Sequence, residues 1–172
     1  MARPLYENSS TLEEEIKFFR DLTTSVTEYK QCRFRKLPLS YRLECAIEHI
    51  PTGKVTGFCE FKRRRNLRTH YPTLMLSLHK YRELAACSEF SDALLFVRWN
   101  DRDGLYEVNK HANPDIRWGG RKDRGDWQDR EPVVHIPVDD FELLDTKRKD
   151  FTEVGKERVI KVWKSGRGWA VG

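Results

Sequence analysis

The sequence predicts a mixed α/β domain in which a central β-sheet is flanked by helices. Apolar residues recur at helical spacing near the N-terminus, over residues 11–23. Two segments of alternating polar and apolar residues follow, 41–50 and 54–62, with a Pro-Thr-Gly turn between them. Because each such element must bury its apolar side against another, this order favours helices packed on a sheet. We expect one domain over residues 1–145 and a basic extension over 146–172, packed on the domain or trailing from it.

The first element is predicted to be a helix over residues 11–23. Ser10 and Glu13 form a capping-box pattern, in which two side chains satisfy free backbone N–H groups at a helix start. Apolar residues then repeat on one helical face, at Leu12, Ile16, Phe19 and Leu22. Glu15 falls within this apolar face, whereas Glu13 and Glu14 point elsewhere. A carboxylate in that position needs a partner or a function.

The two alternating segments are predicted to pair as a hairpin with the three-residue loop Pro51-Thr52-Gly53. Proline suits the first turn position, and glycine suits a position that requires a positive φ angle. With this loop Ile50 pairs with Lys54, and the residue numbers of every later pair sum to 104. The side facing the core would then consist of odd-numbered residues: Tyr41, Leu43, Cys45, Ile47, Val55, Cys59 and Phe61.

The other side of this hairpin carries like charges opposite each other. In the predicted register Glu44 faces Glu60 and Arg42 faces Lys62, an arrangement that destabilises a sheet. Two interpretations stay open: a solvated charged face, or a site where a divalent cation lies between the two glutamates. In the second interpretation Mg²⁺ (or Mn²⁺) removes the repulsion, and Lys62 orients or helps to deprotonate a water molecule. Glu48, on the same side, is a weaker substitute for Glu44.

Further elements are expected along the rest of the chain. They are a strand at 73–76, a helix from the N-cap Ser77 to Cys87, strands at 93–99 and 105–109, a long polar loop at 110–130, a strand at 133–136, a short helix at 141–144 and a strand at 158–163. A loop as long as 110–130 in a compact domain is usually functional or disordered.

Composition narrows the classes of function. The chain has 172 residues and a net charge of +5, which favours a polyanionic partner such as nucleic acid. Its four cysteines show no C-x-x-C or Cys/His spacing, so a zinc site is not expected and the thiols should be reduced. No apolar stretch suits a signal peptide or a membrane span. We therefore expect a cytoplasmic protein that does not contact a membrane.

The triplet Glu60-Phe61-Lys62, behind a helix and a strand with an acidic residue, resembles the PD-(D/E)XK superfamily of restriction-endonuclease-like nucleases. Other segments resemble small phage-encoded members: Lys62-Arg63-Arg64-Arg65, residues 71–80, Gly119-Gly120-Arg121-Lys122-Asp123-Arg124 and Glu131-Pro132-Val133-Val134. This resemblance implies a restriction-endonuclease-like core over roughly residues 10–145. It implies that Glu44 and Glu60 bind Mg²⁺ or Mn²⁺ and that Lys62 is the catalytic lysine. Glu15 would be the catalytic glutamate of the first helix.

The sequence departs from the family at one position, because Glu44 stands where the superfamily usually has an aspartate. Basic and aromatic residues are the candidate nucleic-acid contacts: Arg63, Arg64, Arg65, Arg68, Lys80, Arg121, Lys122, Arg124 and Trp127. Trp118 lies among the same basic residues as Trp127. The implied function is a metal-dependent endonuclease acting on DNA, phage-encoded and working in a bacterial cytoplasm. The alternatives are a catalytically degenerate protein of this fold that binds nucleic acid or a protein partner, and a structural or regulatory phage protein with a basic assembly tail. A second copy of the chain, forming a homodimer, is a further candidate partner.

Overall fold

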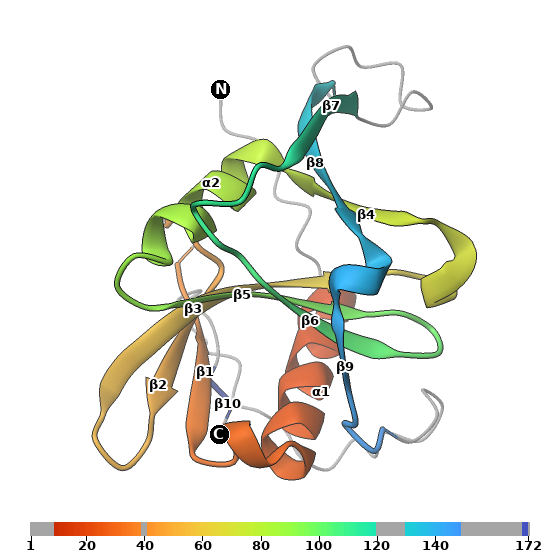
Figure 1. Ribbon diagram of the computed structural model, residues 1–172. Coiled ribbons are helices and arrows are strands. Elements are labelled where there is room, and N and C mark those ends of the chain that lie inside the picture. Colours follow the sequence, from red (N-terminus) through yellow and green to blue (C-terminus); the bar gives the residue numbers. More distant parts are fainter. Residues whose placement is uncertain (1–8, 39–40, 120–129, 149–169, 172) are drawn as a thin grey trace.

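The computed structural model describes residues 9–38, 41–119, 130–148 and 170–171, and it has the mixed α/β architecture that the sequence predicts (Figure 1). The helices are α1 (Ser9–Ser25) and α2 (Leu78–Cys87), with 3₁₀ turns at Thr27–Tyr29, Arg68–His70 and Val138–Asp140. The strands are β1 (Cys32–Lys36), β2 (Cys45–His49), β3 (Lys54–Arg63), β4 (Thr73–Ser77), β5 (Asp92–Arg98), β6 (Asp103–Glu107), β7 (Asp115–Gly119), β8 (Glu131–Pro137), β9 (Glu142–Leu144) and β10 (Ala170–Val171).

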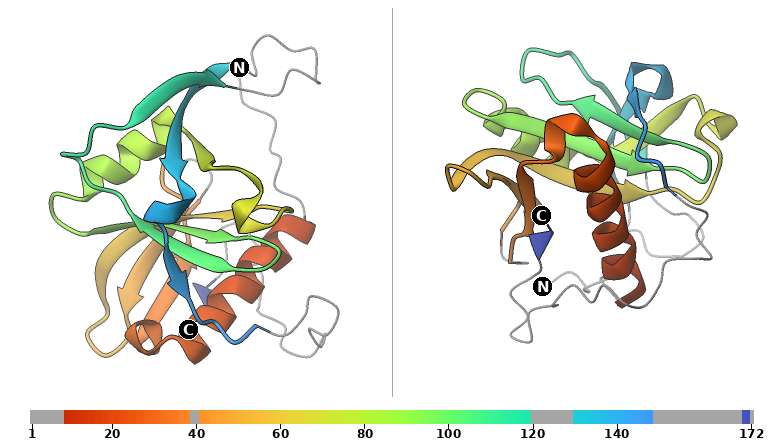
Figure 2. Two further views of the ribbon diagram at one scale, coloured as in Figure 1. Left: turned by 45° about the vertical axis from the view of Figure 1, so that its right-hand side comes forward. Right: turned by 90° about the horizontal axis from the view of Figure 1, so that it is seen from below.

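The strands form two sheets, whereas the sequence predicted one. The larger sheet has seven strands in the order β10-β1-β2-β3-β5-β6-β9, and the smaller has three in the order β4-β8-β7. In the larger sheet β3 and β5 run parallel, while all its other neighbours are antiparallel. The parallel pair is connected through β4 and α2, as a parallel connection requires a crossover. Figure 2 shows the two sheets and the helices from two further directions.

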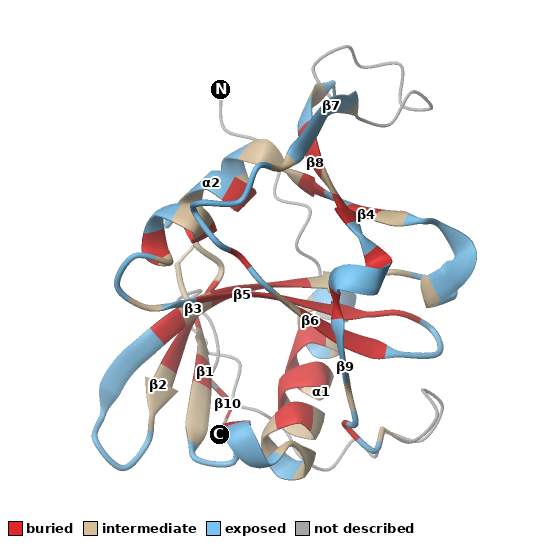
Figure 3. Ribbon diagram, viewed as in Figure 1, coloured by how far each residue is buried: buried red, intermediate tan, exposed pale blue. Residues whose placement is uncertain are grey.

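Two apolar layers hold the fold together, one on each face of the larger sheet (Figure 3). On one face α1 packs Phe18 and Phe19 against aromatic rings of the sheet; Phe18 stacks on Phe61 with ring centroids 4.8 Å apart. On the other face α2 and the smaller sheet cover Leu95, Val97 and other residues of β5. β5 therefore reads as a continuous apolar run because it is buried on both faces.

The first helix agrees with the prediction, except that it begins before the predicted N-cap residue. α1 begins at Ser9, so Ser10 lies inside the helix and is not its N-cap. α2 begins as predicted, because the Ser77 hydroxyl accepts a hydrogen bond from the backbone N–H of Lys80. This bond fixes the first turn of α2 relative to the end of β4.

The β2–β3 hairpin has the predicted register away from its loop, but the loop is longer than predicted and a bulge compensates for the difference. Its loop has four residues, Ile50 to Gly53, because His49 and not Ile50 pairs with Lys54. A β-bulge next to Ile47 then adds one residue on β3, so that Ile47 pairs with Gly57 and Cys45 with Cys59. These pairs again sum to 104, as expected. Gly53 has the predicted positive φ, at 68°.

Because of the bulge, the predicted core side of the hairpin is correct only at its far end. Cys45, Ile47, Cys59 and Phe61 are buried in the α1 layer. Val55 is exposed, because it lies on the loop side of the bulge, where the alternation is shifted by one residue. Tyr41 is also exposed, because β2 begins only at Cys45, and Leu43 packs instead on the α2 layer.

Several short elements differ from the predictions. β1 and β10 were not predicted, and β7 lies within the segment 110–130 that was expected to be a loop. The helix expected at 141–144 is instead β9, preceded by a 3₁₀ turn at Val138–Asp140. The strand expected at 158–163 lies outside the described residues.

A buried ion-pair network ties β5 to β6, to α1 and to the residues after β9. The Arg98 guanidinium donates to both oxygens of Asp103 at 2.8 Å and to Asp21 of α1 at 2.9 Å. It also lies 5.1 Å above the centre of the Phe18 ring. The Thr146 hydroxyl donates to Asp103 and is itself buried. Four parts of the chain are thus joined at one charged group, away from the hairpin glutamates.

Residues beyond the expected boundary at 145 contribute to the fold. Besides Thr146, Val171 of β10 pairs with Phe34 of β1 and is buried in the α1 layer. The division into residues 1–145 and 146–172 stays a prediction. No helix among the described residues is long and apolar enough to cross a membrane.

Candidate active site

Glu60 lies near the end of β3 between two lysines. It is almost fully buried, and Lys62, two residues further along the strand, places its Nζ 3.2 Å from Glu60 Oε1. Lys80 comes from the first turn of α2 and bonds to the same oxygen. The Ser77 cap determines where this turn begins, so the cap also determines where the Lys80 side chain emerges. Glu60 therefore contacts one lysine from its own strand and one from the crossover helix.

Glu44, just before β2, belongs to a second group that the sequence only partly indicated. Its Oε1 lies 2.9 Å from the Nζ of Lys36 on β1, and the same Nζ lies 3.2 and 3.1 Å from the two oxygens of Glu15 on α1. Glu15 is buried, as its place in the apolar stripe predicted. Lys36 is the partner that Glu15 requires. A carboxylate within an apolar helix face predicts that some partner exists, but it does not indicate which residue that partner is.

The two groups touch through Glu44, whose side chain shares hydrogen bonds with both Glu15 and Glu60. Burial opposes ionisation of Glu44, but these bonds and the charges of Lys36 and Lys80 outweigh it and hold its pKa well below the usual range. Burial and the neighbouring Glu44 raise the pKa of Glu15 to about 9 and that of Glu60 to about 7. Protons and lysines thus relieve the predicted repulsion between Glu44 and Glu60.

The raised pKa of Glu15 predicts a specific pH dependence of stability in metal-free protein. The folded state binds this proton more tightly than the unfolded chain, whose carboxyl titrates near its ordinary 4.5. The contribution of Glu15 to stability is therefore full below pH 4.5 and is lost as the pH rises towards about 9. We expect Glu15→Gln to flatten the decline in unfolding free energy over this range, measured by urea titration in chelator.

The control for this measurement is Glu13→Gln, which removes an exposed carboxylate from the same helix turn. It should leave the pH dependence as in the wild type. A decline that is equally steep in Glu15→Gln would contradict the assignment of the proton to Glu15.

The donor atoms at this site suit a hard divalent cation. Mg²⁺ prefers oxygen ligands and is commonly held by one or two carboxylates together with water and substrate phosphate. Glu44 and Glu60 supply such a pair of adjoining carboxylates. Within the described part of the chain, no group of three or more His, Cys, Asp or Glu side chains could by itself hold a metal ion. A bound ion would thus depend on two protein carboxylates and would compete with lysine ammonium groups for them.

Two other residues of the predicted hairpin face do not join the site. Arg42 does not pair with Lys62, because it precedes β2; its side chain is exposed and bonds to Glu83 of α2 at 3.1 Å. Glu48 lies on the loop side of the bulge and pairs with Arg35 of β1, with Nε 3.3 Å from Oε1. Glu48 lies four residues beyond Glu44 along the chain and bonds to Arg35, so it lies outside the group around Glu60.

The basic stretch after β3 is largely bonded to the protein itself. Arg63 donates to the Arg98 carbonyl at 3.0 Å, and Arg65 contacts Glu14 of α1 at 2.5 Å. Arg68 donates to the Val138 carbonyl at 3.1 Å and to Asp139 at 3.2 Å. These contacts anchor the segment between β3 and β4, so its arginines have a structural part besides any contact with a substrate.

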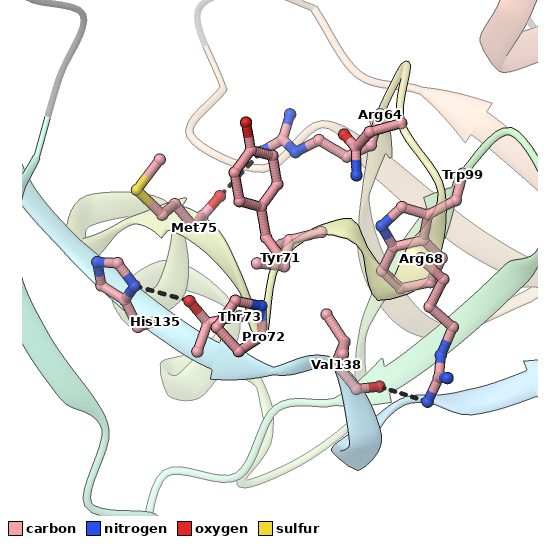
Figure 4. A pocket seen from close by; sticks show the side chains of 11 residues that line it. Arg64, Arg68, Tyr71, Pro72, Thr73, Met75, Trp99, His135 and Val138 are labelled. Carbon is pink, nitrogen blue, oxygen red and sulfur yellow. Dashed lines mark hydrogen bonds between the residues drawn. The ribbon is translucent and has the colours of Figure 1, made fainter.

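Beside this segment lies a cavity of about 430 Å³ between the end of β3 and the smaller sheet (Figure 4). Arg64 lies at one side of it and donates to the Met75 carbonyl at 2.9 Å. Tyr71 projects over it, and His135 bonds to Thr73 in its wall. Arg64 follows Lys62 by two residues, so the cavity lies next to the end of the strand that carries Glu60 and Lys62.

The remaining predicted nucleic-acid contacts fall in different places. Arg121, Lys122, Arg124 and Trp127 lie outside the described residues. Trp118, on β7, is 77% exposed on the smaller sheet. Lys80 contacts Glu60, and its expected contact with a phosphate near the start of α2 stays a prediction.

Comparison with curated proteins and with solved structures gave no match. A family model described as "Phage putative PDDEXK endonuclease" matches residues 1–144, which include α1, the β2–β3 hairpin, α2 and every residue of the glutamate and lysine groups. The mixed α/β fold agrees with the restriction-endonuclease-like core that the sequence resemblance implied. With this match over most of its length, the chain belongs to the phage PD-(D/E)XK nuclease family.

Proposed function

We propose that the protein is an endonuclease that hydrolyses phosphodiester bonds in DNA with Mg²⁺ or Mn²⁺ as its cofactor. The observation that carries this proposal is that the buried Glu60 and the largely shielded Glu44 adjoin each other beside Lys62. Burial of adjoining acids is costly unless a cation compensates them. Membership of the phage nuclease family supports the same conclusion and suggests a bacterial cytoplasm as the place of action.

In this proposal each residue has a defined part. Glu44 and Glu60 would hold the metal ion, which supplies a Lewis acid to neutralise charge on the phosphate and activate water. Burial, together with the charge of Lys80, lowers the pKa of Lys62, so a larger fraction of its amine is neutral and able to accept a proton than in an exposed lysine. Lys62 would orient the attacking water, while Lys80, freed from Glu60 when the ion binds, would balance charge on the substrate.

The substrate would lie across the end of β3. Arg64 and Tyr71, at the adjoining cavity, offer a charge and an aromatic ring to a nucleic-acid strand. Trp118 of β7 presents a second exposed ring on the smaller sheet. These groups suit contact with the DNA backbone and stacking on bases, not recognition of a defined sequence.

The proposal is tested by cleavage of circular and linear DNA with Mg²⁺ or with chelator. We expect nicking of circular DNA by the wild type only with metal, and no cleavage by Glu60→Gln. Glu107→Gln, which alters an exposed glutamate on β6, is the matched control and should cleave normally. Wild-type protein that binds DNA but does not cleave it with either metal would favour the degenerate binding protein.

A further inference from the structure

The three lysines of the candidate site differ in their freedom to move. The side chains of Lys62 and Lys80 are 24% and 31% exposed, so each can swing towards solvent when a metal ion takes its place at Glu60. The Lys36 side chain is only 4% exposed. It has no comparable path to water, because it lies between α1 and the larger sheet.

Lys36 is bonded as a cation enclosed by carboxylates. An ammonium group has three N–H donors. Three carboxylate oxygens lie within 3.2 Å of its Nζ, two from Glu15 and one from Glu44. Each donor thus has an acidic oxygen within reach. A buried lysine held in this way is costly to displace, because its removal leaves the ionised Glu44 without the cation that lies 2.9 Å from it.

The backbone also fixes the position of Lys36. It pairs with Cys45 in the β1–β2 register, and the next residue, Leu37, donates its N–H to the Glu44 carbonyl at 2.8 Å. Lys36 and Glu44 are therefore held together by main-chain bonds on both sides. By contrast, Lys80 approaches Glu60 from a separate helix.

The shortest contacts of the three lysines involve one carboxylate oxygen of Glu44 and one of Glu60. Lys36 contacts Glu44 through Oε1, and both Lys62 and Lys80 contact Glu60 through Oε1. These shortest contacts leave Oε2 of each glutamate as the oxygen that a shared ion would bind. One ion shared by Glu44 and Glu60 is compatible with Lys36 in place, whereas an ion between Glu15 and Glu44 would have to expel it.

We infer that Lys36 is a built-in cation that takes the place of a second metal ion, so that the site binds one divalent ion per chain. This inference rests on the proposed nuclease function and specifies its metal stoichiometry. Lys36 acts through Glu44, which it orients, and is a positioning residue.

The test is the number of Mn²⁺ ions bound per chain, measured by electron paramagnetic resonance of free Mn²⁺ and by calorimetry, without DNA. We expect one ion for the wild type. In Lys36→Met the vacated space between Glu15 and Glu44 should accept a second ion. The melting temperature of this variant should fall in chelator and recover with Mn²⁺. Lys54→Met, an exposed lysine at the far end of β3, should behave as the wild type.

If Lys36→Met does not fold, the double variant Glu15→Gln/Lys36→Met decides the question, because it removes Lys36 together with the Glu15 carboxyl group that would help to hold a second ion. It should bind one ion with affinity within a few-fold of the wild type. Two ions in the wild type, a folded Lys36→Met with only one, or loss of the ion in the double variant would each overturn the inference. A wild type that binds no ion would also overturn the proposed function, so the two failures are distinguishable.

Discussion

Lys62→Ala should lower the rate of metal-dependent DNA cleavage by about 10²- to 10⁴-fold, the usual effect of losing one proton-transferring group. DNA affinity should hardly change, because Lys62 is one of 32 lysine and arginine residues. Glu60 keeps Lys80 as a partner in this variant, so the protein should still fold. The measurement is single-turnover cleavage together with a binding titration in chelator.

Lys54→Ala is the matched control for this experiment, because it removes an exposed lysine from the same strand, beyond the bulge. It should cleave at the wild-type rate. Cleavage by Lys62→Ala at that same rate would show that another group activates the water, and Lys80 would become the candidate.

Asp103→Ala should be the most destabilising single substitution considered, costing about 3–5 kcal/mol of unfolding free energy. It removes the carboxylate that bonds twice to the buried Arg98 and also accepts from Thr146. The melting temperature should fall by roughly 10 °C for a chain of this size. Urea or thermal unfolding followed by circular dichroism measures the loss.

Two further variants separate charge from packing in this network. Glu107→Ala, an exposed residue on the same strand, should change stability by less than about 0.5 kcal/mol. Arg98→Met/Asp103→Leu should recover much of the loss, because the buried guanidinium is removed together with the carboxylate to which it bonds. If the double variant is as unstable as Asp103→Ala, packing at Asp103 and not its charge holds β5 to β6.

Much of the candidate site was predictable because its signals are local. The triplet Glu60-Phe61-Lys62 lies on one regular strand, so the two charged side chains must share a face. Ser77 and Lys80 are likewise related by a single helix cap. The pairing of Glu44 with Glu60 was expected from a loop that proved one residue too short, and the bulge compensated for the error. The sequence of one strand does not reveal such a bulge, because a bulge is defined by how two strands pair.

Lys36 could not be predicted in the same way, because its partners Glu15 and Glu44 are 21 and 8 residues away. A lysine next to Arg35 indicates a solvated surface until the fold places α1 over it. β7 escaped notice for a related reason: it is an exposed edge strand, so burial imposes no alternation on its sequence. Local sequence patterns therefore miss those elements whose structure depends on contacts with residues far away in the chain.

The β-bulge also makes the hairpin tip a suitable place for engineering. Pairing from Ile47 to Cys45 is set by the core on one side of the bulge, and pairing of Glu48 and His49 by the loop on the other. Changes in loop length can therefore be absorbed before they reach Glu44 and Glu60. A fluorophore, an affinity tag or a DNA-targeting module joined at residues 51–53, which are exposed, should leave the candidate site undisturbed.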